Sequence, residues 1–447
     1  MSAIRGADFD VVGGGPAGLL ISILLAQRGA RVTVHERRAD PRRAPPEAGR
    51  SINLALAARG LVALESARLR ALLDDLLVPM RGRQLHEAGG AQRFAAYGQR
   101  PEEQIYSVSR AALTLCLTEA AARMPGITLR FDSRCVGVDA QGRPQVLAGD
   151  AVHTLQAPRC IAADGAGSAV REALERSRAV DSVETFLDHD YKELEFATSP
   201  SARLERHALH IWPRGGFMLI ALPNADGSFT ATLFLPRTGP AGFSALGAPD
   251  AVSRFFAREF PDVLELAPDL TGQFARHPQG RLGTVHASPW HRGESLLLIG
   301  DAAHAIVPFH GQGMNCAFED CRLLAQLFDQ GEPLSFERFF SERRADIEAI
   351  AQMALENYAE MRDGVRDPRF MLQRELSLAL ERRHPRRFVP RYSMVMFRAD
   401  LPYREAFERG ALQQQILDEL TPPGTTLATA DFDRAGRLIE SRLPELP

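Results

Sequence analysis

The 447-residue sequence predicts an α/β protein with an N-terminal βαβ unit, an inserted antiparallel sheet and C-terminal helices. Three observations predict this organisation. The chain opens with a short apolar strand, a glycine-rich turn and an apolar helix that leads into a second strand. From about residue 178, short alternating strands are separated by Gly, Asn, Asp and Pro, which is typical of an antiparallel sheet with one covered face. Beyond residue 334 the pattern is helical.

The composition is that of an ordinary globular protein, with 45% hydrophobic and 24% charged residues. The 53 basic and 56 acidic residues give a net charge of -3, which provides no overall field for nucleic acid or anionic membranes. The five cysteines form no C-x-x-C pair, which favours free thiols in a reducing compartment. Signal-peptide features are absent, and no apolar run reaches the roughly 20 residues of a spanning helix. We expect a cytoplasmic protein without a nucleic-acid partner or membrane anchor.

The first elements follow one another closely. Residues 8–12 form the opening strand, about 17–28 the helix, and 31–36 the second strand, which ends at Glu36. The charged, proline-rich segment 37–49 predicts a loop. Helical patterns resume at about 54–76 and again at about 110–124.

A G-x-G-x-x-G motif lies between the first strand and the helix. Gly13 permits a tight turn, Gly15 allows the backbone to approach a pyrophosphate, and Gly18 allows close packing of the helix on the strand. The helix N-terminus would supply free N–H groups to the phosphates, and Glu36 is placed to hold ribose hydroxyls. Turn formation alone would explain the glycines, but the strand, helix and acidic residue together predict dinucleotide binding.

Two aspartates that follow apolar strands indicate which dinucleotide is bound. Asp164 and Asp301 lie far along the chain from the first motif, as an extended FAD molecule requires. Asp301 would accept hydrogen bonds from the ribityl chain, and the helix that begins in 311–315 would direct its N–H groups at the flavin. A plain strand-to-helix turn with an aspartate cap is the alternative.

The predicted fold is therefore a Rossmann-like FAD-binding domain with an inserted antiparallel β-sheet substrate domain and C-terminal helices. The expected boundaries are 1–177 and 286–333 for the FAD-binding domain, 178–285 for the sheet and 334–447 for the helices. Only one G-x-G-x-x-G motif is present, so a pyridine nucleotide would bind transiently rather than in a second Rossmann domain.

The combination of motifs resembles a known group of enzymes. GGGPAG (13–18), ADGAGS (163–168) and GDAAHAIVPFHGQGMN (300–315) are similar to the single-component (group A) flavin-dependent aromatic hydroxylases. Further stretches resemble the kynurenine 3-monooxygenase family more specifically: GRSINLALA (49–57), MRGRQLH (80–86), ALHIWPRG (208–215), FTATLFLP (229–236), FHGQGMNCAFEDC (309–321) and QMALENYAEMRD (352–363).

This resemblance implies a reaction and a substrate site. The expected activity is hydroxylation of L-kynurenine at ring position 3, with tight, non-covalent FAD, O2, and NADPH as a transient co-substrate, in tryptophan degradation and pyridine nucleotide synthesis. The residues implied to bind the amino-acid carboxylate are Arg83, Tyr97, Asn357 and Tyr392. Those implied to wall the aromatic ring are Phe234, Pro308, Phe309 and His310.

The cofactor residues combine the motif and the resemblance. The full set expected to hold FAD is Gly13, Gly15, Ala17, Gly18, Glu36, Arg37, Arg38, Ala55, Arg110, Asp301, Gly313, Met314 and Asn315. Because the aniline ring of the substrate is already electron-rich, no side-chain acid or base is assigned. We also expect no metal site, because His304 and His310 are not spaced as a helical ligand pair.

Two alternatives remain open at this point. Another group A hydroxylase could act on an anthranilate or a phenol, although a phenol hydroxylase needs a base or proton chain that the sequence does not reveal. A non-catalytic binder on the same fold would lack bound flavin. The sequence does not indicate an oligomeric state or a preference for NADPH over NADH.

Overall fold

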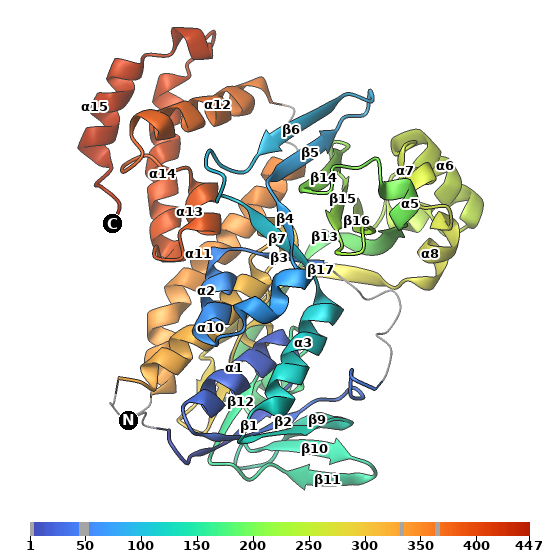
Figure 1. Cartoon of the computed structure of the whole chain (residues 1–447), viewed down its shortest axis with the longest axis vertical. Helices are drawn as coiled ribbons and strands as arrows, with labels where there is room; N and C mark the ends of the chain where they lie inside the picture. Colours follow the sequence, from blue (N-terminus) through green and yellow to red (C-terminus); the bar gives the residue numbers. More distant parts are fainter. Residues whose placement is uncertain (1–3, 44–52, 331–334, 363–366) are drawn as a thin grey trace.

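The computed structural model describes residues 4–43, 53–330, 335–362 and 367–447. Figure 1 shows three regions: a parallel sheet with its helices, a large antiparallel sheet, and helices formed by the last part of the chain. Of the predicted loop at 37–49, residues 44–49 lie outside the described residues. The α/β class with an antiparallel sheet and C-terminal helices is confirmed.

A six-stranded sheet forms the centre of the first region. Its order is β18-β19-β12-β1-β2-β8, and all neighbours are parallel except β18 and β19. Because β19 pairs with β12, the chain returns to this sheet after forming the antiparallel one. The strands are β1 (Asp8–Val12), β2 (Arg31–His35), β8 (Ile127–Arg130), β12 (Arg159–Ala162), β18 (His291–Arg292) and β19 (Leu296–Leu298).

Helix α1 (Pro16–Gln27) follows β1 directly and confirms the predicted βαβ unit. Its residues from Gly18 to Ala26 are buried, because the sheet and the helices α3 (Arg110–Arg123) and α10 (Gly313–Leu327) surround it. A helix that is apolar on all sides is stable only in such a position. Pro16 at the first helical position loses no hydrogen bond, since that N–H has no intrahelical acceptor.

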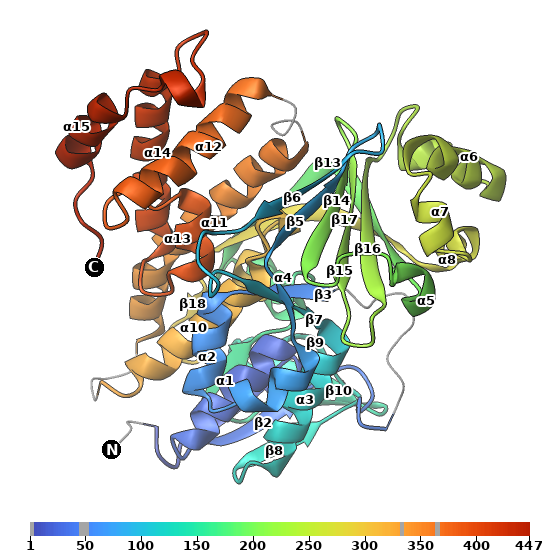
Figure 2. The ribbon, with the colours of Figure 1, turned by 45° about the horizontal axis from the view of Figure 1, so that its top comes forward.

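The antiparallel region is a seven-stranded sheet of order β17-β13-β16-β15-β14-β5-β6. Its last two strands come from residues 82–96, within the segment that we had assigned to the FAD-binding domain, and β5 lies parallel to β14. Figure 2 shows this sheet above the parallel-sheet region. Its strands are β5 (Gly82–His86), β6 (Gln92–Ala96), β13 (Asp181–Phe196), β14 (Ala208–Pro213), β15 (Met218–Pro223), β16 (Phe229–Pro236) and β17 (Gln279–Ser288).

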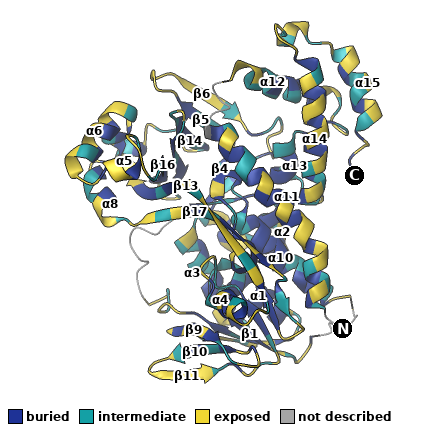
Figure 3. Ribbon diagram, turned by 180° about the vertical axis from the view of Figure 1, so that it is seen from behind, coloured by how far each residue is buried: buried dark blue, intermediate teal, exposed yellow. Residues whose placement is uncertain are grey.

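The sheet is covered on both faces at its centre, whereas the alternating pattern predicted one covered face. All residues of β16 except the last are buried. Helices α6 (Pro249–Glu259), α7 (Val263–Leu266) and α8 (Leu270–Arg276) pack an aromatic cluster against one face. The other face lies over the centre of the molecule. Figure 3 shows that the outer sides of α6 and α8 are exposed.

One predicted helix is only partly correct. Residues expected to be helical from about 54 form the strand β3 (Asn53–Leu56), which pairs with β7 (Ile105–Ser109). The helix α2 (Ala58–Ser66) then begins, followed by a 3-10 helix at Arg70–Leu76. Short apolar runs of this kind fit a strand or a helix equally well, and the pairing with β7 decides the outcome.

The C-terminal part forms five helices within the described residues and packs against α10. Helix α11 contacts α10, and α13 and α14 pack together. No helix of the described residues is sufficiently long and apolar to cross a lipid bilayer. The helices are α11 (Phe336–Arg362), α12 (Pro368–Arg383), α13 (Arg391–Phe397), α14 (Tyr403–Leu420) and α15 (Phe432–Arg442).

Two histidines pair inside the seven-stranded sheet. His210 donates from Nε2 to the Glu205 carbonyl (2.8 Å), so its Nδ1 accepts from His86 Nε2, also at 2.8 Å. The His86 ring stacks on Trp212 with centroids 4.1 Å apart. Burial and the neighbouring His210 lower the pKa of His86 to about 4. His86 is therefore neutral in the folded protein at neutral pH.

This depressed pKa predicts an acid-sensitive stability. Between pH 6.5 and 4 the unfolded chain binds the proton and the folded chain does not, so the free energy of unfolding falls as the pH falls. The His86 contribution is at most about 1.4 kcal/mol per pH unit. We expect His86→Gln, which keeps an N–H donor but cannot be protonated, to reduce this slope in urea denaturation at pH 7, 6 and 5. The matched variant His153→Gln, at an exposed position, should show the wild-type dependence of the free energy of unfolding on pH. The same dependence in all three proteins would contradict the lowered pKa of His86.

Candidate active site

A cavity of about 430 Å³ lies between the parallel-sheet region and the seven-stranded sheet. This size is within the usual range of ligand pockets. Its lining joins most of the residues expected from the sequence at both the cofactor and the substrate site. They are Gly15, Ala17, Ala55, Arg110, Asp301, Gly313, Met314, Arg83, Tyr97, Phe234, Pro308, Phe309, His310 and Tyr392.

The glycine turn after β1 has two different functions. A Cβ at Gly13 would lie 2.5 Å from the Ala163 carbonyl oxygen, and one at Gly18 would lie 1.9 Å from that of Gly13. These glycines therefore allow the chain to pack on itself. A Cβ at Gly15 would meet no atom within 4 Å, and Gly15 lines the cavity. Its backbone is open to a ligand at the N-terminus of α1, where phosphate groups bind favourably.

Glu36 stabilises the same turn from the end of β2. Its carboxylate accepts hydrogen bonds from the Gly14 N–H (2.7 Å) and the Arg38 N–H (3.0 Å). Arg37 and Arg38 are exposed beside it. Gly13, Gly18, Glu36, Arg37 and Arg38 lie next to the turn but outside the lining of the cavity. The expected contact of Glu36, Arg37 and Arg38 with the adenosine half of FAD remains a prediction.

Asp301 and the start of α10 form the next part of the cavity wall. The side chain of Asp301 is exposed to the cavity and makes no hydrogen bond with the described residues. Burial raises the pKa of Asp301, although the positive charges of Arg110 and His304 oppose the shift. Gly313 and Met314, the first residues of α10, lie beside it. A free carboxylate, two helix N-termini and an open glycine turn fit the hydroxyl, phosphate and ring groups of FAD.

Asn315 and Asn357 bond to the backbone of cavity-lining segments, and their expected contacts with FAD and substrate stay predictions. The Asn315 amide donates to the carbonyls of Ala55 and Gly311 and accepts from the Ala57 N–H, all at 2.8 Å. Asn357 donates to the Phe309 carbonyl at 2.6 Å. Neither residue lines the cavity. In this structure both amides hold the backbone of cavity-lining segments in place, and direct contact of Asn357 with a substrate stays a prediction.

The opposite end of the cavity contains a half-buried arginine among tyrosines. The guanidinium carbon of Arg83, on β5, lies 4.7 Å from the Tyr392 ring centroid and 5.7 Å from that of Tyr97. The two tyrosine rings stack at 5.8 Å. Arg83 Nε and the Tyr97 hydroxyl are buried and have no hydrogen-bond partner among the residues that the structure describes. Since buried donors are nearly always paired, this arrangement indicates a site for an anionic ligand group.

An aromatic wall connects this end with the start of α10. Phe309 stacks on Tyr358 at 4.2 Å and contacts Phe234 at 5.1 Å. His310 stacks on Tyr392 at 5.3 Å. Burial lowers the pKa of His310 to about 3, and the nearby Arg391 and Arg83 act in the same direction. His310 is therefore a neutral ring in this wall.

The sequence did not reveal several lining residues on the seven-stranded sheet. Tyr191, Leu209, Ile220 and Arg281 all face the cavity. The alternation of inward side chains along each strand is a signal for them, but it does not specify which face covers a ligand. No group of described residues has the His, Cys, Asp and Glu composition of a metal site.

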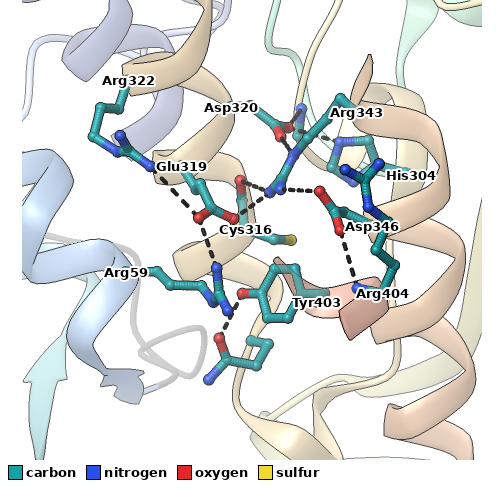
Figure 4. Close-up of polar contacts among 12 residues, drawn as sticks. Arg59, His304, Cys316, Glu319, Asp320, Arg322, Arg343, Asp346, Tyr403 and Arg404 are labelled. Atoms are coloured by element: carbon teal, nitrogen blue, oxygen red, sulfur yellow. Dashed lines mark hydrogen bonds and ion pairs between the residues drawn. The ribbon is translucent and has the colours of Figure 1, made fainter. Parts of the chain in front are cut away.

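A buried network of charges lies behind the flavin end of the cavity (Figure 4). Asp320 on α10 accepts from the Gly300 N–H (3.2 Å), His304 Nε2 (2.7 Å) and Arg343 Nε (2.9 Å). The adjacent Glu319 contacts Arg59 at 2.8 Å and Arg343 at 2.7 Å. The charges of His304 and Arg343 outweigh burial and lower the pKa of Asp320. Asp320 therefore fixes the turn at Gly300, where φ is +56°, immediately before Asp301.

Comparisons with known proteins agree with this geometry. The model of an FAD binding domain family matches residues 7–353. The chain is 46% identical over 453 aligned positions to kynurenine 3-monooxygenase of Stenotrophomonas maltophilia (strain K279a), covering 100% of this chain and 99% of that protein. Identity is also 46%, over 454 positions with the same coverage, to kynurenine 3-monooxygenase of Xanthomonas euvesicatoria pv. vesicatoria (strain 85-10). The tetrameric form of 2-methyl-3-hydroxypyridine-5-carboxylic acid oxygenase superposes with a TM-score of 0.65 at 21% identity, over 81% of this chain and 95% of that one, which shows the shared fold.

The fold and the cavity are those of an FAD-dependent monooxygenase, and the chain belongs to the kynurenine 3-monooxygenase family. It is a flavoprotein enzyme. The non-catalytic binder considered from the sequence is therefore set aside.

The charge network predicts a specific effect of Asp320→Asn. The amide keeps the size of the side chain but leaves Arg343 and His304 without their shared negative partner. We expect a loss of about 3–5 kcal/mol in the free energy of unfolding, together with weaker FAD retention because the turn before Asp301 loses its anchor. Urea denaturation and the FAD content after ultrafiltration measure the two effects.

The matched control is Glu342→Gln, which removes an exposed ion pair with Arg338. This variant should lose less than about 1 kcal/mol and keep its FAD. An Asp320→Asn protein that retained FAD and stability as the wild type does would contradict a positioning role for Asp320.

Proposed function

We propose that this enzyme hydroxylates L-kynurenine at ring position 3 to 3-hydroxykynurenine, with NADPH and O2 as co-substrates. The observation that carries the proposal is the continuity of the cavity: the half-buried Arg83 and the expected flavin-binding segment at Asp301 line one space. The names of the full-length relatives support this choice of substrate.

The two ends of L-kynurenine match the two ends of the substrate region. Its carboxylate accepts hydrogen bonds from the buried donors of Arg83 and Tyr97. A planar guanidinium can bind a carboxylate through two such hydrogen bonds. Its aromatic ring then lies against Phe234 and Phe309, which place it towards the start of α10. The rings of Tyr392 and His310 close the space between these groups.

FAD, held tightly and without a covalent bond, supplies the reduction by NADPH, the activation of O2 and the transfer of one oxygen atom. The chain binds and orients the reactants. Asp301 would accept hydrogen bonds from the ribityl chain, and the α10 N-terminus would favour negative charge on the flavin when it is bound. The aromatic wall excludes water and holds the ring. Because its pKa is about 3, His310 is neutral at neutral pH and cannot act as a cationic acid. The electron-rich ring of the substrate requires no side-chain base.

The first prediction from this proposal concerns the carboxylate. Arg83→Ala should weaken L-kynurenine binding by about 2–4 kcal/mol, because a charge-assisted contact is lost and its partner stays unpaired. Tyr97→Phe should have a smaller effect in the same direction, since only one hydroxyl is removed. The dissociation constants are measured from the change of flavin absorbance on titration, with FAD content as the control for folding. An unchanged constant for Arg83→Ala would remove Arg83 from the site, and tighter binding of anthranilate than of L-kynurenine would favour the alternative hydroxylase.

The second prediction concerns the order of events. Ligand contacts at Arg83, Phe309 and His310 should shift the pocket to a state that permits flavin reduction. L-Kynurenine should therefore accelerate NADPH oxidation strongly in stopped-flow measurements. An analogue that keeps the carboxylate but cannot accept oxygen should also accelerate it and release hydrogen peroxide. Equal reduction rates with and without ligand would show that the substrate does not control reduction.

A further inference from the structure

Arg281, on β17, lines the cavity opposite the parallel-sheet region without a charged partner. Its guanidinium carbon lies 3.6 Å from the centroid of the Phe186 ring, and it forms neither a hydrogen bond nor an ion pair with any residue that the structure describes. Arginine side chains in protein cavities normally meet a carboxylate, a phosphate or several acceptors. The Arg281 side chain is exposed, so water can satisfy its N–H groups; what distinguishes it is its position in the cavity lining, stacked on Phe186.

The sheet is irregular at Arg281. The pairing of β13 with β17 changes register between Phe186, opposite Gly283, and Asp190, opposite Arg281. Residues 187–189 of β13 thus bulge opposite the single residue Leu282. Bulges of this kind redirect side chains and are frequent beside functional sites.

Two glycines flank Arg281 and make room for aromatic rings. A Cβ at Gly280 would lie 2.3 Å from the Tyr191 ring, and a Cβ at Gly283 would lie 2.7 Å from Phe186. A larger residue at position 283 would displace the Phe186 ring on which Arg281 stacks, and one at position 280 would displace Tyr191. The bulge, the glycines and the stacked ring together hold the guanidinium at the cavity wall.

The charges of the cavity lining indicate what Arg281 binds. Among the described residues, the lining contains three arginines, Arg83, Arg110 and Arg281, and one carboxylate, Asp301. Arg83 is enclosed by tyrosines at the proposed carboxylate site, and Arg110 acts on Asp301 at the flavin end. The FAD diphosphate is expected to bind at the glycine turn and the N-terminus of α1, so it does not require Arg281. The proposed reaction brings one further anion into reach, and this is NADPH.

We propose that Arg281 binds a phosphate group of NADPH and that the reductant docks against the β13–β17 side of the cavity. This inference rests on the proposed function, since it takes NADPH as the reductant. A guanidinium held by ring stacking presents its N–H groups to a phosphate with little loss of conformational entropy. Both the diphosphate and the 2′-phosphate of NADPH offer this chemistry.

The test uses the yellow holoenzyme and NADP+, so that binding is measured without turnover. By calorimetry, Arg281→Gln should weaken NADP+ binding about 10- to 100-fold, as expected for the loss of a charged hydrogen bond. Arg281→Lys should recover part of the affinity, and Phe186→Ala should show a smaller loss because the guanidinium remains. FAD content and the dissociation constant of L-kynurenine should stay within about twofold of the wild type.

A comparison with NADH identifies the phosphate. If the KM for NADPH rises while that for NADH does not, Arg281 contacts the 2′-phosphate; if both rise equally, it contacts the diphosphate. The control is Arg254→Gln, another exposed arginine without a hydrogen bond to described residues, on α6 away from the cavity lining. This variant should bind NADP+ normally.

Unchanged NADP+ affinity in Arg281→Gln would overturn the inference. If L-kynurenine also bound more weakly to this variant, Arg281 would belong to the substrate site instead. The proposed function is tested separately by the wild-type protein. If the wild type oxidised NADPH without hydroxylating L-kynurenine, the substrate assignment would fail, and the effect of Arg281→Gln on NADP+ binding would still decide the role of Arg281.

Discussion

Two adjacent carboxylates buried on α10, those of Glu319 and Asp320, hold together the elements on which the flavin end of the site depends. Burying ionised carboxylates is costly unless every charge is paired and hydrogen-bonded. The partners come from three other elements: Arg59 on α2, Arg343 on α11, and His304 at the end of the short helix α9 (Asp301–His304). If any one of these elements moves, a buried charge loses its partner. The network therefore makes the relative positions of the turn before Asp301, the α10 N-terminus and the strand that carries Ala55 interdependent.

The substrate end follows a different principle. It is formed by elements from distant parts of the sequence, namely β5 with Arg83, the segment after β6 with Tyr97 and α13 with Tyr392. Stacked rings and apolar contacts join them, and few of their polar atoms bond to one another. The buried donors are thus left for a ligand, while aromatic packing supplies the stability that hydrogen bonds supply at the flavin end. Met361 on α11 and Tyr392 and Met396 on α13 line the cavity, so part of the C-terminal region belongs to the site itself.

The electrostatic character of the cavity fits reactants that carry anionic groups, namely the carboxylate of the amino acid and the phosphates of NADPH. Three guanidinium groups face a single carboxylate in its described lining. The one histidine of this lining is held neutral by burial and by the positive charges near it, so it adds shape without charge. Recognition therefore depends on fixed positive groups, whereas the chemistry depends on the flavin and on a dry, aromatic surface.

By itself, the sequence determined the parts of this protein that local chemistry controls. The turn at Gly13, Gly15 and Gly18 and the βαβ unit around it depend on neighbouring residues, as does the Asp301 segment that leads into α10. The residues of the substrate site were inferred from resemblance, and the structure brings most of them into one cavity. Only the tertiary structure decided that β5 and β6 extend the seven-stranded sheet. The same holds for the hydrogen bonds of Asn315 and Asn357 to the backbone. It also holds for the position of Arg281 in the cavity wall, stacked on Phe186 and without an ion pair to a described residue. Turn and helix preferences act over a few residues, but strand pairing and the partners of a buried side chain depend on which distant segments exclude water together.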